Sequence, residues 1–108
     1  MLELWQTEWC PASRRVRQRL TELEVDYVIH QVPVAKDERT ALVTATGSDI
    51  IPALLDHGDV LVGEDAIRRR LDRTIAESTR AGAHRLKAET ARHRYLEEEC
   101  ECSQPATR

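Results

Sequence analysis

The sequence predicts an α/β domain in which helices flank both faces of a four-stranded mixed sheet. Runs typical of strands alternate with longer amphipathic stretches in the order β-α-β-α-β-β-α, and one more helix is expected near the C-terminus. The opening βαβ unit requires two parallel strands joined by a right-handed crossover. A later pair of adjacent strands is typical of a hairpin, which adds antiparallel pairing to the sheet.

The first three elements form the βαβ unit. Residues 2–6 alternate apolar and polar side chains, which predicts a short strand. Pro11 suits the first position of a helix, where its missing N–H costs nothing. Apolar residues then recur at helical spacing through residues 11–24, while the basic residues between them are expected to face solvent. Residues 27–32 are rich in strand formers and predict the second strand.

A weaker helix and a hairpin are expected next. The helix is predicted over residues 36–46, and Gly47 can end it by adopting a positive φ. Two short apolar runs, at residues 52–56 and 60–62, flank a turn that contains a glycine. This arrangement predicts two antiparallel strands joined by a tight turn.

Two further helices are predicted after the hairpin. Glu64 and Asp65 are expected at the start of the first helix, because acidic residues complement the positive end of a helix. Its apolar stripe predicts a helix that continues to about residue 81 and ends at Gly82. A polar helix is expected over residues 83–100. We accordingly expect a main domain over residues 1–80, a helical extension over 81–102 and a disordered tail over 103–108.

Composition excludes several classes of protein. The net charge of -3 argues against a nucleic-acid module, which usually carries a basic excess. No apolar run approaches the roughly 20 residues of a membrane span, and the N-terminal residues do not resemble a signal peptide. We therefore expect a cytoplasmic monomer or weak homodimer. Three cysteines in a reducing compartment indicate individual thiol roles rather than a disulfide framework.

Cys10 lies where the first strand gives way to the first helix. In this N-cap position its sulfur can accept hydrogen bonds from the N–H groups of Ala12 or Ser13, and the helix dipole, Arg14 and Arg15 add positive charge. Cysteines in such settings have pKa values lowered from about 8.5 to roughly 3.5–7.5, and the thiolate attacks disulfides. The alternative is a small buried hydrophobic residue.

Ser13 stands where a Cys-x-x-Cys redox site carries its second thiol. Its hydroxyl can hydrogen-bond the sulfur of Cys10 but has no means of forming a disulfide. Chemistry at Cys10 is therefore expected to pass through a mixed disulfide with a small thiol, which a second thiol from solution resolves. The alternative is an ordinary polar residue in the first turn of a helix.

Three motifs follow one another along the chain: Trp-Cys-Pro-Ala-Ser-Arg-Arg-Val-Arg at 9–17, Ile-Pro-Ala-Leu at 51–54 and Val-Gly-Glu-Asp-Ala-Ile at 62–67. They resemble the Cys-Pro-x-Cys/Ser site, the cis-proline segment and the glutathione-binding turn of glutaredoxins and of the N-terminal domain of glutathione transferases. The resemblance covers about residues 2–75 and implies a thioredoxin-like fold.

The resemblance also implies roles for individual residues. Pro52 would be cis rather than an ordinary trans proline at an edge strand, and the backbone of Ile51 would pair with the cysteinyl part of glutathione. The start of the helix at Glu64 would hold the γ-glutamyl end, the alternative being helix capping alone. The implied catalytic residues are Cys10 and Ser13, and the implied substrate-binding residues are Pro11, Ile51, Pro52, Glu64 and Asp65.

The chain also departs from these families. Many glutaredoxins carry a lysine three residues before the cysteine, where it contacts the glycyl carboxylate of glutathione, whereas this chain has Thr7 followed by Glu8. Lys36 or Arg39 could substitute for that lysine. The segment from Ala83 onward is too short for the helical second domain of a transferase, so a conjugating transferase is not expected.

The sequence thus predicts a glutaredoxin-like thiol–disulfide oxidoreductase with one nucleophilic cysteine. Its co-substrate would be glutathione or an equivalent low-molecular-weight thiol, its partners glutathionylated or disulfide-bearing proteins, and no metal is expected. One alternative is an iron–sulfur-binding monothiol glutaredoxin, from whose Cys-Gly-Phe-Ser motif Pro11 and Ala12 depart. Another is a non-catalytic transferase-like interaction domain.

Cys100 and Cys102 are interpreted first as part of the polar end of the last helix, and two other interpretations are possible. With His93 and Glu97 they could imitate a metal site. They could instead trap a mixed disulfide formed on Cys10, if the C-terminal segment reaches it.

Overall fold

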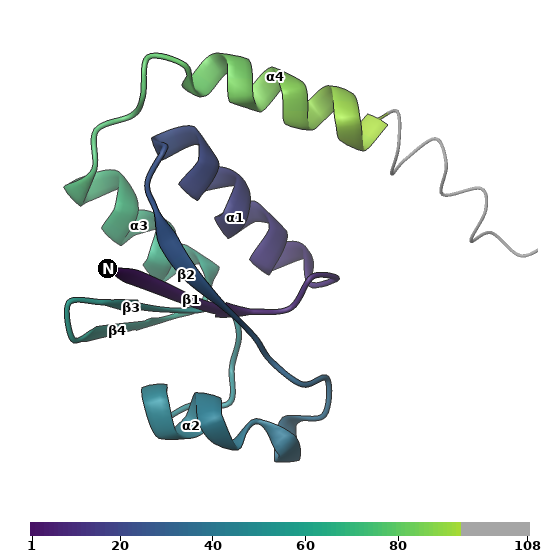
Figure 1. Ribbon diagram of the computed structural model, residues 1–108, viewed down its shortest axis with the longest axis vertical. Coiled ribbons are helices and arrows are strands. Elements are labelled where there is room, and N and C mark those ends of the chain that lie inside the picture. Colours follow the sequence, from purple (N-terminus) through teal and green to yellow (C-terminus); the bar gives the residue numbers. More distant parts are fainter. Residues whose placement is uncertain (94–108) are drawn as a thin grey trace, which may run out of the picture.

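The computed structural model of the chain, which describes residues 1–93, is built on a four-stranded sheet with the order β2-β1-β3-β4 (Figure 1). Strand β1 pairs in parallel with β2 and antiparallel with β3, and β3 and β4 form the predicted hairpin. The strands span β1 (Leu2–Gln6), β2 (Tyr27–Gln31), β3 (Ala53–Asp56) and β4 (Asp59–Val62).

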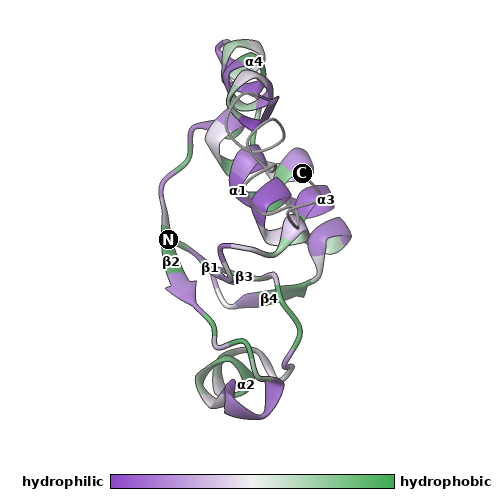
Figure 2. Ribbon diagram, turned by 90° about the vertical axis from the view of Figure 1, so that its right-hand side faces the viewer, coloured by the Kyte–Doolittle hydropathy of each residue, from purple (hydrophilic) through white to green (hydrophobic). Residues whose placement is uncertain are grey.

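The helices lie in layers on the two faces of this sheet. Helices α1 and α3 pack together on one face, α4 lies outside α1, and α2 lies on the opposite side of the sheet (Figure 2). This arrangement confirms the predicted α/β, thioredoxin-like fold with an added C-terminal helix. The helices span α1 (Pro11–Leu23), α2 (Thr40–Thr46), α3 (Glu64–Thr74) and α4 (Ala81–Ala91), with a 3₁₀ turn at Lys36–Glu38.

Two apolar clusters hold the layers together. The larger lies between the sheet and helices α1 and α3, and the smaller joins the sheet to α2 through Val32, Leu42 and Ala53. In β1 the side chains alternate between the two faces, so the inward positions are buried while the others stay partly exposed. The larger cluster consists of Leu2, Leu4, Val16, Leu20, Leu23, Leu54, Ile67 and Leu71.

Two of the predicted helices break or end before the expected residue. The helix expected over 36–46 is interrupted at Arg39, whose backbone leaves the helical region at φ -88° and ψ 45°. Helix α3 ends at Thr74 instead of near residue 81, because Ile75 adopts an extended conformation and packs against the larger cluster. Gly82 therefore lies inside α4 and does not end a helix.

The C-terminal part of the chain is described only to residue 93. Helix α4 begins two residues before the predicted start, while Cys100, Cys102 and the tail over 103–108 lie outside the described residues. The division into 1–80, 81–102 and 103–108 stays a prediction. Within the described range, no helix is both long and apolar enough to cross a membrane.

Charged side chains fasten α4 to the end of α1. Glu24 accepts hydrogen bonds from Arg80 and His84, both at 2.7 Å. Arg85 donates to Glu77 at 2.7 Å and lies 3.4 Å from the buried carboxylate of Glu22. Ala81 is the one buried residue of α4, so charge holds the helix more than apolar packing does. We call this set, completed by Arg19, the ionic clamp: Arg19, Glu22, Glu24, Glu77, Arg80, His84 and Arg85.

We expect Leu54→Ala to lower the free energy of unfolding by about 2–5 kcal/mol, because it opens a cavity at a fully buried position of the central strands. Urea unfolding followed by circular dichroism measures the change. The matched control is Leu86→Ala on α4, where the side chain is 64% exposed, and it should change stability by about 0.5 kcal/mol or less. Equal losses in the two variants would contradict the described core.

We expect acid to release α4 before it unfolds the sheet. Hydrogen bonds from Arg80 and His84 lower the pKa of Glu24 from its usual 4.5 to about 2. Because this pKa is depressed in the folded chain, its stabilising contribution is complete above pH 4.5 and is lost as the pH falls towards 2. Amide hydrogen exchange should show faster exchange in α4 than in β1 over that range. Uniform exchange in both elements would contradict an ionic attachment.

Candidate functional site

The three sequence motifs meet at one edge of the sheet. Trp5, near the end of β1, pairs with Ala53 at the start of β3, so Pro52 lies beside the segment that leads to Cys10. The backbone N–H of Gly63 donates to the carbonyl of Pro52 at 2.8 Å, which brings the start of α3 to the same edge. The Ile51–Pro52 peptide is cis, as the resemblance implies.

Cys10 is the N-cap residue of α1. Its backbone is extended, with φ -79° and ψ 121°, and its carbonyl accepts a hydrogen bond from the N–H of Arg14 at 2.9 Å. The N–H of Ser13 donates to the sulfur at 3.4 Å, and Pro11 occupies the first helical position. The thiol is free and partly exposed. The predicted cap geometry is therefore present at a partly exposed cysteine.

Ser13, three residues after Cys10, is fully buried. Its hydroxyl accepts a hydrogen bond from the N–H of Thr7 at 3.5 Å. Partial burial raises the pKa of Cys10, but hydrogen bonds from the side chain and N–H of Ser13 and from the N–H of Ala12, together with the charge of Arg15, outweigh burial. The pKa of Cys10 is therefore lowered, which favours the thiolate.

Arg15 and Glu64 join the first turns of α1 and α3 across the site. The guanidinium donates two hydrogen bonds to the carboxylate, at 2.7 and 2.8 Å, and these bonds lower the pKa of Glu64. Bidentate pairs of this kind fix geometry as well as charge. Glu64 is thus already engaged, whereas Asp65 is exposed and, within the described chain, has no charged group at salt-bridge distance. Only Asp65 of the two predicted acidic residues has its carboxylate open.

A polar network supports the segment that carries Cys10, and the sequence reasoning missed it. Arg17, which was expected to face solvent, donates to the side chain of Gln6 and to the carbonyls of Thr7 and Glu8. Gln31 donates to the carboxylate of Glu8 at 2.8 Å. The available signal was Gln6 itself, since a polar residue at an inward strand position needs a partner when buried.

Thr7, which stands in place of the family's lysine, and Arg39, one of its two candidate substitutes, are both buried. Thr7 is 1% exposed and therefore lies away from solvent. Arg39 is also buried, and its guanidinium donates to the carbonyls of Pro33, Val34 and Asp49. Arg39 thus fastens the loops around α2, contrary to the expectation that it could serve a ligand, and Lys36 remains as the exposed cation of this segment.

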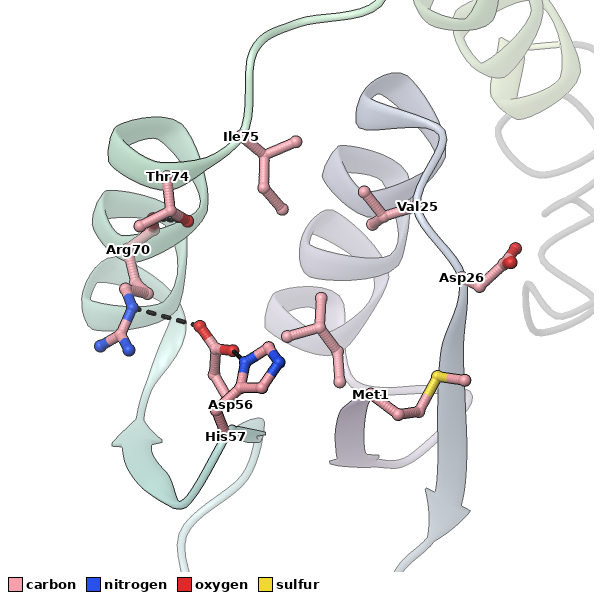
Figure 3. Close-up of a pocket in the computed structure, with 9 residues that line it drawn as sticks. Met1, Val25, Asp26, Asp56, His57, Arg70, Thr74 and Ile75 are labelled. Atoms are coloured by element: carbon pink, nitrogen blue, oxygen red, sulfur yellow. Dashed lines mark hydrogen bonds and ion pairs between the residues drawn. The ribbon is translucent and has the colours of Figure 1, made fainter.

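A cavity of about 480 Å³ lies at the other end of the sheet (Figure 3). The carboxylate of Asp56 at its wall faces His57 at 2.6 Å and Arg70 at 3.2 Å. The residues predicted for the site do not line this cavity. The cavity and Cys10 lie at opposite ends of β1, because the cavity opens beside Leu2 at the start of the strand and Cys10 follows its end.

These features define a thioredoxin-fold thiol site, with a capped cysteine, a neighbouring cis-proline and a third motif at a helix start. The family model for the N-terminal domain of glutathione S-transferase matches residues 9–74, and the chain belongs to this family. A search of curated proteins finds no significant match.

Solved structures show the same fold. A diazinon-metabolizing glutathione S-transferase from the silkworm Bombyx mori is 28% identical with a TM-score of 0.61, and the match covers 68% of this chain and 37% of that protein. The unclassified transferase 2 from the same species is 19% identical, with a TM-score of 0.63 and coverages of 71% and 37%. A buckwheat glutaredoxin in complex with glutathione is 21% identical, with a TM-score of 0.53 and coverages of 64% and 66%. The chain thus spans little more than a third of these two transferases.

We expect Ser13→Ala to raise the pKa of Cys10, because the variant removes the hydroxyl donor and leaves the backbone donor in place. The rate of iodoacetamide alkylation at Cys10, followed against pH by peptide mass spectrometry, should then rise at a higher pH than in the wild type. Thr21→Ala removes another α1 hydroxyl, which donates to the backbone carbonyl of Arg17, and should leave the profile unchanged. Superimposable profiles for Ser13→Ala and the wild type would show that the hydroxyl of Ser13 does not lower the pKa of Cys10.

Proposed function

We propose that this protein is a glutathione-dependent thiol–disulfide oxidoreductase that acts through Cys10. The observation that carries the proposal is a partly exposed sulfur at the N-terminus of α1, with donors that lower its pKa. The Cys10 thiolate attacks the glutathione sulfur of a mixed disulfide, forms a disulfide with glutathione and releases the substrate thiolate, which takes up a proton. A second thiol then attacks the glutathione sulfur of that disulfide, forms a disulfide with glutathione and releases the Cys10 thiolate.

The surroundings of Cys10 support a role in holding glutathione. The backbone of Ile51, before the cis bond, is suited to pair with the cysteinyl part of an extended peptide, and Pro11 and Pro52 would border it. The N–H groups in the first turn of α3 would donate hydrogen bonds to the γ-glutamyl carboxylate, and the open carboxylate of Asp65 would pair with its ammonium. Glu64 would then act through Arg15 by fixing the guanidinium near Cys10.

The same observations weigh on the alternatives. A non-catalytic interaction domain has no need of an activated thiol, so the lowered pKa of Cys10 speaks against it. The expected substrates are glutathionylated or disulfide-bearing proteins, and the expected location is the reducing cytoplasm. Ser13 offers no second thiol in the first turn of α1, so the resolving thiol comes from elsewhere, and free glutathione suffices for turnover.

We expect Cys10→Ser to reduce release of a glutathionylated peptide by about 100-fold or more, because the variant lacks the attacking thiolate. The assay mixes protein, peptide and excess reduced glutathione and follows the free peptide by mass spectrometry. Thr90→Ala, at an exposed position of α4, is the matched control and should keep the wild-type rate. Wild-type rates no faster than those of Cys10→Ser would refute the proposed activity.

A further inference from the structure

The cavity beside the start of β1 takes no part in the thiol site (Figure 3). Its volume of about 480 Å³ falls within the range of roughly 300–1,000 Å³ that is typical of sites for small molecules. It lies between the end of α3, the turn that joins β3 to β4, the start of β1 and the residues that precede β2. Segments that are distant in the sequence therefore enclose a space large enough for a ligand.

One part of the cavity wall is apolar. Leu2, Val25 and Ile75 line it, and all three also pack in or against the larger apolar cluster. Val25 and Ile75 are only partly buried, so they leave apolar surface at the cavity while the core holds them in place. Met1, which is 69% exposed, lies at the rim. Covering this surface with an apolar molecule removes it from water and is favourable.

The polar part of the wall presents one oriented acceptor, the imidazole of His57. Its Nδ1 lies 2.6 Å from Oδ1 of the buried carboxylate of Asp56, whose Oδ2 lies 3.2 Å from Nε of Arg70. Because an ionised carboxylate only accepts hydrogen bonds, Nδ1 carries the proton, and the neutral ring keeps its lone pair on Nε2. Figure 3 shows this second nitrogen on the side of the ring that faces Met1.

The backbone at His57 is in a conformation that few residues with a side chain adopt. Its φ is 52° and that of Gly58 is 92°, positive at both central positions as in a type I′ turn. Asn and Gly are the usual residues at the first of these positions. The side chain of His57 is 78% exposed, so it adds little to the core. Neither the turn nor the core therefore requires an imidazole here.

The charged groups near the ring are engaged with one another or face elsewhere. Arg70 divides its guanidinium between Asp56 and Asp59, at 3.2 and 2.5 Å. The carboxylate of Asp26 points away from the cavity in Figure 3. The acceptor on His57 is thus the group best placed to recognise a ligand, which favours an uncharged molecule with a hydrogen-bond donor over an ion.

We propose that this cavity is a second binding site, which takes a small, largely apolar molecule that carries one hydroxyl donor, such as a phenol. The apolar body lies against Leu2, Val25 and Ile75, and the hydroxyl donates to Nε2 of His57. A phenolic hydroxyl suits this acceptor, because it donates well and stays uncharged below a pKa of about 10. Asp56 is a positioning residue, since its contact with Nδ1 fixes the tautomer and the direction of the ring.

The test titrates nitrogen-15-labelled full-length protein with 2-naphthol and follows the amide chemical shifts by NMR. The wild type should show saturable shifts in residues 25–26, 56–58 and 70–75, which border the cavity, and none in residues 9–13. 2-Methoxynaphthalene has the same rings but no donor, and its Kd should be about tenfold higher. Shifts that do not saturate, or that centre on residues 9–13, would overturn the inference.

A variant of the turn isolates the contribution of the imidazole. His57→Gly removes the ring, and glycine adopts the positive φ without strain, so the fold should persist. This variant should raise the Kd of 2-naphthol about tenfold and leave that of 2-methoxynaphthalene unchanged. Cys10→Ser is the control at the opposite end of β1 and should leave both Kd values unchanged. A Kd for 2-naphthol that His57→Gly does not alter would show that the ring does not recognise the hydroxyl and would refute the proposed site.

Discussion

The chemistry of this domain depends on the hydrogen bonds that the start of α1 donates to one sulfur. Backbone N–H groups at a helix start have no partners within the helix, and a capping side chain satisfies one of them. Here the capping atom is the sulfur of Cys10, which accepts from Ser13. A sulfur in this position gains more from these donors as a thiolate than as a thiol, so the same contact that begins the helix also activates the nucleophile.

The rest of the fold keeps that contact in place. Val16 and Leu20 bury α1 against the sheet, which fixes where the helix starts relative to the end of β1. Side chains hold the segment that joins β1 to α1. Arg17 donates to the carbonyls of Thr7 and Glu8, and the buried hydroxyl of Ser13 accepts from the N–H of Thr7. Buried polar groups that are paired in this way hold their geometry well.

Ion pairs and hydrogen bonds to carbonyls give the arginines distinct structural roles. Arg15 joins α1 to α3 through Glu64 beside the thiol, Arg39 ties the loops around α2 by their carbonyls, and the ionic clamp attaches α4. Single surface ion pairs contribute little to stability, but a network of several with partly buried members is more effective. From composition alone these basic residues would be expected only to cover the surface. In the structure they connect the helices and loops around the sheet.

The sequence alone predicts much of the fold and part of the site, because strands, helices and caps reflect local periodicity and local hydrogen bonding. The order of helices and strands along the chain and the place of Cys10 at a helix start follow from residues a few positions apart. The end of α3 at Thr74, the burial of Arg39 and the engagement of Glu64 by Arg15 do not. Each depends on a partner outside the periodicity of a single element: Ile75 packs against an apolar cluster, Arg39 binds loop carbonyls on either side of it, and Arg15 meets a residue 49 positions away. Such partners become neighbours only when the sheet brings separate segments to one edge, so packing and not local pattern decides them.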